Sequence, residues 1–426
     1  MKNLKFALFA GMLLLFGCQD TVTETVTYMI NEPVFMSADD FRKSVNVTTR
    51  VIPISDYGKI CFYEGYIYIA ATGKGIHIID NRNTANPQNI GFIEMIGNAD
   101  LSIRNGKLYA DANVDLVWFD ISNPAMPELE GRLENVFARH MPLPPTYNDY
   151  PIDYINTSKG VVVGWTVSER TDTYTSTYKK LKWGNKDIKE DTKNLQSSGP
   201  SGSLSSSNGI NGSMSRFALY NNYLYSVINN SMSIIDLRGS EPVKVAENIY
   251  IGQDVETIFS YNDNMFMGTP TGMIIYSVSN PLKPEFMSSV SHVLGCDPVV
   301  VEDDIAYVTI HSGNWCGQNT NELLIYNVSD VRNPKHIVSY SMTKPKGLGI
   351  DNGTLFICDD GLKIFNAENP QTIMANKLAH YSGMEGYDVI PFNDVLMMIA
   401  EDGLYQYDYS DLSNIKELSK LPITRR

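Results

Sequence analysis

The sequence predicts an all-β fold, a seven-bladed β-propeller of four-stranded blades, and two observations carry this prediction. First, a unit of about forty residues recurs along the chain, which is the period of a propeller blade. Second, each unit contains four short apolar segments separated by Gly, Asn and Pro turns. Because a single blade cannot bury both of its faces, the units are expected to close into a ring.

The unit at 98–133 shows the pattern most clearly, with strands expected at 101–103, 108–110, 116–121 and 129–133. Its third strand is apolar without alternation, which is typical of a strand buried on both faces. The turn before the second strand recurs at Gly65, Gly106, Asn222, Asn264, Asp304, Gly353 and Asp394.

An aspartate ends the third strand in several units, at Asp80, Asp120 and Asp236. A turn follows it, often with proline. Because one active site does not need a copy in every blade, we interpret these aspartates as turn-forming residues.

Two segments resemble a known repeat. Gly75-Ile-His-Ile-Ile-Asp80 with the later Asn86-Pro87, and Asp115-Leu-Val-Trp-Phe-Asp-Ile-Ser-Asn-Pro124, are similar to the LVIVD repeat. That family consists of bacterial and archaeal cell-surface proteins, thought to be β-propellers and mostly of unknown function. The resemblance extends from about residue 55 to the C-terminus, apart from one insertion, and it implies a fold and a location but almost no activity.

The N-terminus has the pattern of an export signal. Lys2 and Lys5 precede an apolar stretch, 6–16, which is too short to span a bilayer. Leu15-Phe-Gly-Cys18 resembles a lipobox, which implies a lipoprotein signal peptide at 1–17 and acylation, such as palmitate, on Cys18. The alternative is an ordinary secretory signal with a chance cysteine.

Residues 18–40 are predicted to be a tether, and 41–426 the propeller domain. The polar, slightly acidic start of the tether resembles the surface-export signals of lipoproteins in Bacteroidetes-like bacteria, which implies an outer-membrane lipoprotein on the cell surface or the periplasmic face. Residues 41–54 have strand composition and are a candidate to close the ring against the last blade. The C-terminal 415–423 competes for that place, and the sequence leaves the choice open.

The formal net charge is −14 at pH 7, from 48 acidic and 34 basic residues. An acidic protein without a basic stripe repels nucleic acid and anionic lipid. The expected membrane partner is therefore the bilayer reached by the N-terminal lipid, and nucleic acid is not expected as a partner.

The repeat is interrupted once, by an insertion at about 134–214 between blades 2 and 3. Its Ser/Gly-rich end, 197–213, is expected to be flexible, so that deleting 180–213 leaves the ring folded. The alternative to a functional insertion is an extended hairpin with a disordered tip. Aromatic side chains on long loops are candidate contacts for a protein or glycan: Tyr147, Tyr150, Tyr154, Trp165, Trp183 and Trp315.

Cys296 and Cys316 fall on one face of the fifth blade and are predicted to form a disulfide in an oxidising envelope. A metal site that adds His292 and His311 is the alternative, although the spacing matches no structural zinc motif. Two cysteines in strands of other units are expected to be buried free thiols: Cys61 and Cys358.

Several units place an acid near the start of the first strand, where the blades converge on the channel mouth. A ring of such carboxylates is a candidate calcium site or a source of acid–base catalysis. The alternative is that each acid ends a turn by accepting backbone amide hydrogen bonds. The candidates are Asp56, Asp100, Asp254, Glu256, Asp297 and Asp388, and the sixth unit has Pro345-Lys346-Gly347 instead.

The sequence contains no nucleophile elbow, phosphate-binding glycine loop or dinucleotide fingerprint. We therefore predict a non-catalytic binding or scaffold lipoprotein that recognises a protein or glycan. One alternative is an envelope glycan hydrolase or lyase that uses carboxylates near the channel mouth, and another is a purely structural surface protein.

Overall fold

The computed structural model describes residues 22–55, 57–137, 142, 144–147, 149–176, 209–228, 230–252, 254–291, 298–312 and 320–424. The chain divides into two compact units. The first is Met1–Val34, Pro144–Ile155 and Trp165–Ser197, and the second is Phe35–Leu143, Asn156–Gly164 and Ser198–Arg426.

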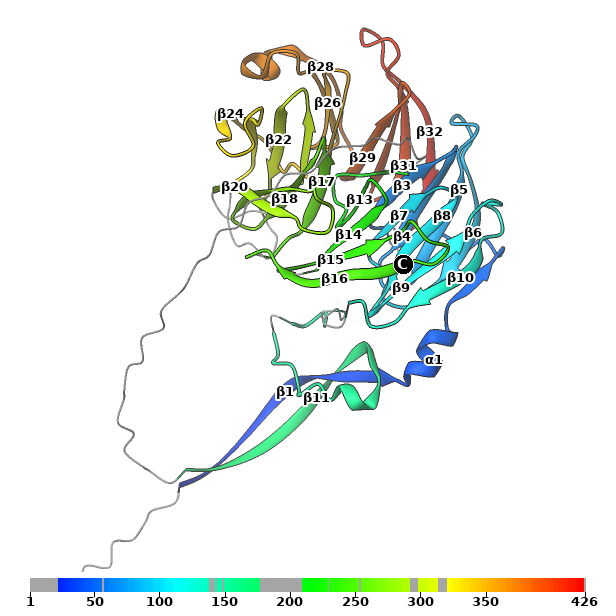
Figure 1. Cartoon of the computed structure of the whole chain (residues 1–426), viewed down its shortest axis with the longest axis vertical. Helices are drawn as coiled ribbons and strands as arrows, with labels where there is room; N and C mark the ends of the chain where they lie inside the picture. The colour runs from blue at the N-terminus through cyan, green and yellow to red at the C-terminus, as the bar shows by residue number, and fades with distance from the viewer. Residues whose placement is uncertain are drawn as a thin grey trace, which may run out of the picture. The chain divides into compact units, whose positions relative to one another are not determined.

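The second unit is a seven-bladed β-propeller, which confirms the fold predicted from the sequence (Figure 1). In each blade of the described chain, four consecutive strands pair antiparallel in chain order. Blades 1 to 3 are β3 (Ile60–Tyr63), β4 (Tyr66–Ala71), β5 (Gly75–Asp80) and β6 (Gln88–Glu94); β7 (Leu101–Arg104), β8 (Lys107–Ala112), β9 (Asp115–Asp120) and β10 (Glu128–Leu133); β13 (Phe217–Tyr220), β14 (Tyr223–Ile228), β15 (Ser231–Asp236) and β16 (Val243–Tyr250).

The remaining blades follow the same order. Blades 4 and 5 are β17 (Thr257–Tyr261), β18 (Asn264–Thr269), β19 (Gly272–Ser277) and β20 (Glu285–Ser291); β21 (Val299–Glu302), β22 (Ile305–Ile310), β23 (Glu322–Asn327) and β24 (Lys335–Ser341). Blades 6 and 7 are β25 (Leu348–Asp351), β26 (Thr354–Cys358), β27 (Leu362–Asn366) and β28 (Lys377–Tyr381); β29 (Gly386–Phe392), β30 (Val395–Ala400), β31 (Gly403–Asp408) and β32 (Lys416–Pro422).

Local sequence explains why each blade forms. The two-residue hairpin between first and second strands needs positive φ, and Asn105 and Gly106 adopt 49° and 72° there. The third strands are buried as predicted, and β9 has five consecutive buried residues. In every blade, a bulge or register shift interrupts the pairing between the third and fourth strands. Such irregularities limit further strand pairing at the outer edge.

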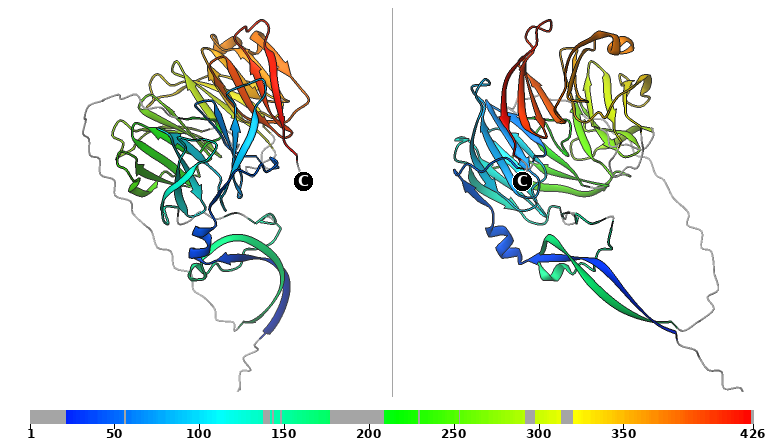
Figure 2. Two further views of the ribbon diagram at one scale, coloured as in Figure 1. Left: turned by 90° about the vertical axis from the view of Figure 1, so that its right-hand side faces the viewer. Right: turned by 180° about the vertical axis from the view of Figure 1, so that it is seen from behind.

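The ring closes by side-chain packing between blades 1 and 7, whose strands lie side by side in both sets of views (Figures 1 and 2). Aliphatic side chains of both blades form one buried cluster, including Ile69 and Ile399. The amides of Asn81 and Gln406 donate to each other at 2.9 and 2.7 Å. The seam is therefore held by apolar burial and a paired buried amide.

The question of which segment completes the ring is resolved by the register. Within 41–54, β2 (Asn46–Thr48) pairs with β6 at the outer edge of blade 1. The C-terminal β32 pairs with β31 and is the fourth strand of blade 7. Each blade is therefore built from one continuous stretch of chain, and β2 is a fifth strand on blade 1.

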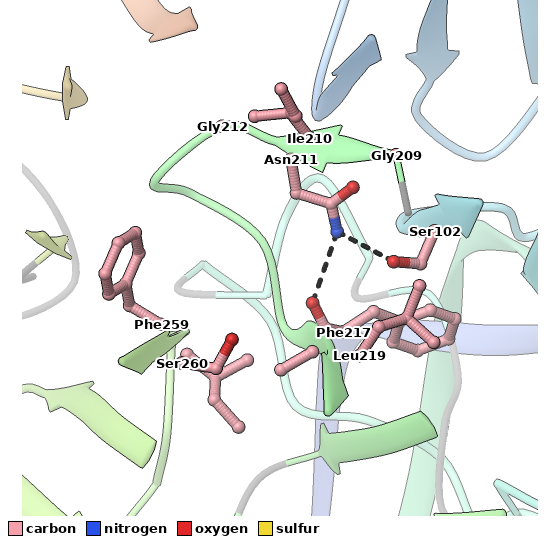
Figure 3. A pocket seen from close by; sticks show the side chains of 11 residues that line it. Ser102, Gly209, Ile210, Asn211, Gly212, Phe217, Leu219, Phe259 and Ser260 are labelled. Atoms are coloured by element: carbon pink, nitrogen blue, oxygen red, sulfur yellow. Dashed lines mark hydrogen bonds between the residues drawn. The ribbon is translucent and has the colours of Figure 1, made fainter. Parts of the chain in front are cut away.

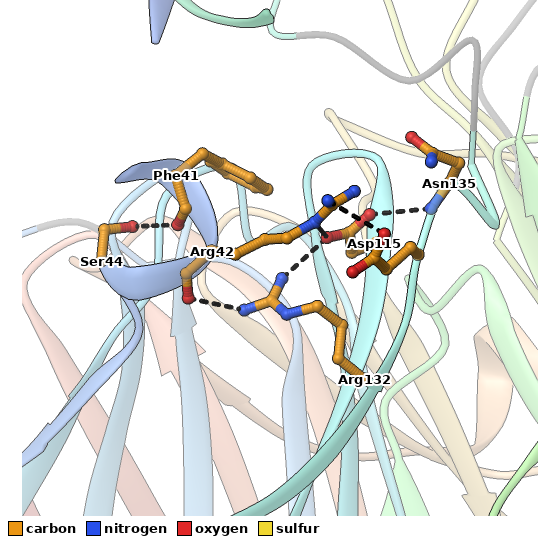
Figure 4. A network of polar contacts seen from close by, with 7 residues as sticks. Phe41, Arg42, Ser44, Asp115, Arg132 and Asn135 are labelled. Atoms are coloured by element: carbon orange, nitrogen blue, oxygen red, sulfur yellow. Dashed lines mark hydrogen bonds and ion pairs between the residues drawn. The ribbon is translucent and has the colours of Figure 1, made fainter. Parts of the chain in front are cut away.

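Helix α1 (Ala38–Lys43) is anchored on blade 2 by a buried ionic network (Figure 4). Asp115, whose side chain is fully buried, accepts from Arg42 Nε at 3.1 Å, Arg132 Nη1 at 2.9 Å and the Asn135 amide at 2.8 Å. The side chain of Phe41 is also buried. These contacts fix the entry of the chain into the propeller beside the start of the insertion.

The first unit contains most of a long two-stranded ribbon, formed by β1 (Val22–Met36) and β11 (Val161–Ser176). Strand β1 lies within the segment predicted to be a tether, and β11 lies within the predicted insertion. Hydroxyl pairs join the two strands, with Thr27 and Thr171 at 2.9 Å. The second unit also contains two short 3-10 helices: η1 (Thr157–Lys159) and η2 (Pro370–Asn376).

Among the residues that the structure describes, no helix has both the length and the apolar character needed to cross a membrane.

Candidate functional site

The channel of the propeller is crossed by the chain itself, through residues 209–216, which we call the axial segment. It contains β12 (Ile210–Asn211), which pairs with β3. Gly209 donates its amide to the carbonyl of Ile103 at 2.6 Å, and Gly212 donates to the carbonyl of Ile60 at 3.1 Å. The axial segment thus satisfies the channel-facing edges of blades 1 and 2.

The same segment also bonds to blades across the ring. The amide of Ile258, in blade 4, donates to the carbonyl of Ser215 at 2.8 Å. The amide of Leu348, in blade 6, donates to Ser213 Oγ at 2.9 Å. A single stretch of chain therefore connects blades that are far apart in sequence, and its removal would expose their inner strand edges.

This finding corrects an expectation about the insertion. Residues 209–213 belong to its Ser/Gly-rich end, which was predicted to be flexible and dispensable. The structure instead buries Ser213 in the channel. The prediction that this stretch is flexible is therefore wrong for 209–213, which are held by hydrogen bonds of their backbone and of the Asn211 and Ser213 side chains. Deletion of 180–213 is now expected to disturb the ring.

Asp388, at the start of blade 7, holds the axial segment by its carboxylate. It accepts from the amide of Ser213 at 3.1 Å, from Ser213 Oγ at 2.9 Å and from the amide of Met214 at 3.2 Å. Burial raises the pKa of Asp388 to about 6, although these hydrogen bonds oppose the shift. The carboxylate is thus a buried acceptor for the chain's own amides.

Two glycines make room for this carboxylate. A Cβ at Gly212 would lie 2.0 Å from Asp388 Oδ2, and one at Gly347 would lie 2.4 Å from Oδ1. Neither distance is compatible with van der Waals contact. The sequence Pro345-Lys346-Gly347, which replaces the acid in the sixth unit, therefore supplies space for the acid of the seventh.

Asp100, at the start of blade 2, has the same role on the other side. Its Oδ1 accepts from Ser215 Oγ and from the amide of Leu101, both at 2.9 Å, and its Oδ2 accepts from the amide of Arg216. Asp100 is buried. Asp100 and Asp388 therefore both bind the axial segment. They accept hydrogen bonds from backbone amides, which was the alternative to a calcium-binding ring of carboxylates.

Asp111 was not identified from the sequence. It lies in β8 and accepts from the amides of Ala99 and Asp100, both at 2.8 Å. Burial raises the pKa of Asp111 to about 7, against the lowering effect of those amides. The signal that could have found it is an aspartate inside an otherwise apolar second strand, Leu-Tyr-Ala-Asp-Ala.

Lys59 adds a positive group to this cluster of carboxylates. Burial lowers the pKa of Lys59 to about 8, and the charges of Asp100 and Asp388 partly offset that effect. Near the axis of the ring, the pKa values of Asp111 and Asp388 are therefore raised toward 7, and the pKa of Lys59 is lowered toward 7.

The other acids predicted at the channel mouth are Asp56, Asp254, Glu256 and Asp297. Asp254 is exposed and Glu256 is half-buried, while Asp56 and Asp297 lie outside the described residues. Within the described part of the chain, no group of three or more His, Cys, Asp or Glu could hold a metal ion. The calcium ring therefore stays a prediction, without a cluster in these residues to support it.

The recurrent aspartates at the ends of third strands act as turn residues, which confirms their interpretation. The amides of Arg82, Ser122 and Arg238 donate to the aspartate two residues earlier, at 3.2, 2.7 and 2.9 Å. The side-chain hydrogen bonds of Arg82 and Arg238 contribute most to the lowered pKa of Asp80 and Asp236, and the amide of Ser122 contributes most to the lowered pKa of Asp120.

The structure describes some of the predicted aromatic contacts and cysteines. Tyr147, Tyr150, Tyr154 and Trp165 belong to the first unit, and Tyr154 is 82% exposed. Cys61 and Cys358 are buried free thiols, as predicted. His311 is described, whereas Cys18, Trp183, His292, Cys296, Trp315 and Cys316 lie outside the described residues, so the lipid anchor, the disulfide and its metal alternative stay predictions.

A pocket of about 220 Å³ lies against the axial segment (Figure 3). Residues of blades 2, 3 and 4 complete its wall. The lining consists of Ser102, Gly209, Ile210, Asn211, Gly212, Phe217, Ala218, Leu219, Ile258, Phe259 and Ser260.

Fold and repeats together define the class, a β-propeller that carries LVIVD repeats. The LVIVD repeat family matches residues 56–93, 100–134 and 211–248, which correspond to blades 1 and 2 and to blade 3 with most of the axial segment. A search of curated proteins found no match to this chain.

The chain is similar to several solved structures at low sequence identity. The periplasmic gluconolactonase of Pseudomonas aeruginosa aligns with a TM-score of 0.53 at 10% identity, over 87% of this chain and 98% of that one. The computationally designed Ika8 protein gives 0.47 at 8% identity, over 88% and 90%. BamB from Moraxella catarrhalis gives 0.45 at 10% identity, over 83% and 84%. At this identity the gluconolactonase shows the fold alone, and the two lower scores carry no argument.

Proposed function

We propose that this protein is a non-catalytic binding module, anchored to the outer membrane by a lipid on Cys18, which recognises a protein or glycan partner through the ribbon of β1 and β11. The anchor places the protein on the cell surface or the periplasmic face. The proposal continues the function predicted from the sequence and assigns its binding surface to the first unit.

The exposed ribbon carries this proposal. Two-stranded ribbons are marginally stable in water, and an outer strand edge can pair with an incoming strand. In this ribbon the edge of β1 is already paired at Asn31, with Pro151 and Asp153. The described part of this ribbon also exposes large apolar and aromatic side chains, together with a loop tyrosine of the same unit. They are Val26, Met29, Val34, Val167, Tyr174 and Tyr154.

The axial carboxylates support a non-catalytic role. A general acid or base needs a lone pair or proton that a substrate can reach. Asp388 and Asp100 instead accept amides and hydroxyls of the axial segment. Their hydrogen-bonding capacity is largely used within the chain.

The raised pKa values of Asp388 and Asp111 favour a second candidate, an envelope hydrolase or lyase acting on glycans, because displaced carboxyl pKa values are common in active sites. This candidate predicts turnover of envelope glycans that is lost in Asp388→Asn. Absence of turnover by the full chain between pH 5 and pH 8 would exclude it.

Photo-crosslinking in cells tests the binding surface even while the partner is unidentified. A photoreactive phenylalanine analogue at Tyr154 or Tyr174 should give a discrete crosslinked adduct of the envelope fraction. The matched control is Tyr250, which is 69% exposed on the outer strand of blade 3. Equal adducts from all three positions, or none from the ribbon unit, would contradict the proposal.

The anchor has its own test. Metabolic labelling with palmitate should mark the full chain, and Cys18→Ser should abolish the label and release the protein from the detergent phase. Label that persists in Cys18→Ser would refute lipidation at this residue.

A further inference from the structure

Among the described strands, none pairs with the outer side of β13 in blade 3 or of β17 in blade 4, and both edges face the pocket beside the axial segment. In an antiparallel pair, alternate residues direct their N–H and C=O groups away from the partner strand. Tyr220 pairs with Tyr223 across a two-residue turn, so Phe217 and Leu219 direct these groups away from β14. Ser260 is placed in the same way with respect to β18, because Tyr261 pairs with Asn264.

Two observed hydrogen bonds confirm this register. The carbonyl of Phe217 accepts from Asn211 Nδ2 at 3.3 Å, and the amide of Ile258 donates to Ser215 at 2.8 Å. Both bonds cross from a first strand to the axial segment. The next positions along the same edges, Leu219 and Ser260, line the pocket.

Asn211 closes one wall of the pocket in a fixed orientation. Its Nδ2 lies within hydrogen-bonding distance of four acceptors, among them Ser102 Oγ at 3.0 Å and Ser215 Oγ at 3.1 Å. Figure 3 shows the amide nitrogen directed toward Ser102 and Phe217. The hydrogen bonds of Asn211 therefore hold this wall of the pocket in place.

The chemistry of the lining selects a class of ligand. None of the residues that line the pocket is charged. Phe259 is their partly exposed aromatic residue, because the ring of Phe217 packs against Phe137 in the core between blades 2 and 3. Figure 3 shows Phe259 and Ser260 on one side, and Phe217 and Leu219 on the other. Edge amides, edge carbonyls and a serine hydroxyl match a ligand that both donates and accepts hydrogen bonds, and an aromatic ring packs on its apolar face.

The volume limits the size of that ligand. The pocket holds about 220 Å³, whereas sites for drug-sized molecules hold about 300–1,000 Å³. A ligand comparable to one sugar ring fits this space.

We infer that the pocket between the axial segment and the first strands of blades 3 and 4 binds an uncharged, polyhydroxylated compound the size of a monosaccharide. The groups that would contact this ligand are the edge amides and carbonyls of Leu219 and Ser260, the hydroxyl of Ser260 and the ring of Phe259. This site shares no residue with the ribbon, so it stands or falls independently of the proposed function.

Calorimetric titration of the purified full chain in detergent tests the inference. Glucose, galactose, mannose and N-acetylglucosamine are the probes, and at least one should bind saturably at one site. Ser260→Leu, which fills the pocket, should weaken that binding at least about tenfold. Ser289→Leu is the matched control on the exposed outer strand of the same blade, and it should bind as the parent does.

Ser260→Ala keeps the test decisive if the leucine variant does not fold, because it removes the hydroxyl without adding bulk. Its binding should be several-fold weaker than that of the parent. Glucuronate should bind more weakly than glucose, since no cation lines the pocket. Failure of all four neutral sugars to bind, unchanged binding by Ser260→Leu and Ser260→Ala, or equal binding of glucuronate would overturn the inference.

Discussion

Aspartates occupy two contrasting positions in this propeller, the rim turns and the channel axis. At the rim, Asp120 accepts the amide of Ser122 within its own turn, and its pKa is lowered. At the axis, Asp388 accepts from Ser213, 175 residues away in the chain, and burial raises its pKa to about 6. The same side chain thus forms a local turn in one place and a long-range tie in the other.

The contrast teaches how burial decides the energetic role of a carboxylate. At the rim, solvent replaces any hydrogen bond that is lost, so each turn contributes little. At the axis, water is excluded and each donor left behind carries its full desolvation cost. We expect effects of mutation to follow this order.

The largest effect is expected from Asp388→Ala. Ser213 and Met214 would lose the acceptor of their amides inside the channel, and each unsatisfied donor costs about 1–3 kcal/mol. We predict a loss of about 4 kcal/mol in the free energy of unfolding, measured by urea titration of the full chain. A loss below about 1 kcal/mol would show that the axial segment is held by other contacts.

The next effect concerns the space around the same carboxylate. Gly212→Ala places a Cβ against Asp388, and overpacking of a buried site costs about 1–3 kcal/mol. Gly164→Ala is the matched control, because no atom lies within 4 Å of the Cβ it would add. If both variants melt at the parent temperature, the axial segment adapts its position freely.

The pH dependence of stability separates the two classes of aspartate. The folded pKa values of Asp111 and Asp388, about 7 and about 6, lie above the unfolded value of about 3.9, so the folded state retains protons that the unfolded state has lost. Their contribution to the free energy of unfolding is therefore expected to rise as the pH falls from about 7 to about 4.

The rim aspartates act in the opposite sense and in a lower window. Because the pKa values of Asp80, Asp120 and Asp236 are lowered, their contribution to the free energy of unfolding is present above about pH 4 and is lost as the pH falls further.

Urea titrations at pH 4.5, 5.5 and 7 measure how the free energy of unfolding changes with pH. The slope of that free energy against pH should be smaller in Asp111→Asn than in the parent. An unchanged slope in that variant would contradict the assignment to the axis.

The smallest effect is expected at the rim. Asp120→Ala removes one turn hydrogen bond at the surface and should lower the free energy of unfolding by about 1 kcal/mol or less. Thermal melting of this variant beside Asp388→Ala gives a direct comparison. A loss at Asp120 as large as that at Asp388 would refute the distinction between the two positions.

The blades could be predicted from local sequence patterns alone. Turn residues, apolar third strands and a period of about forty residues are local signals, and they gave the propeller, the turn role of Asp80 and the burial of Cys61. Asp100 and Asp388 were also found, because an acid precedes the first strand in several units.

The position of the axial segment in the channel follows only from the closed ring. Residues 209–213 belong to the Ser/Gly-rich run 197–213, whose composition predicts flexibility. They are ordered because inner strand edges of separate blades, such as those of Ile60, Ile103 and Ile258, require hydrogen-bond partners inside the ring. Such a requirement exists only after the blades have closed, and no local pattern in the sequence records it.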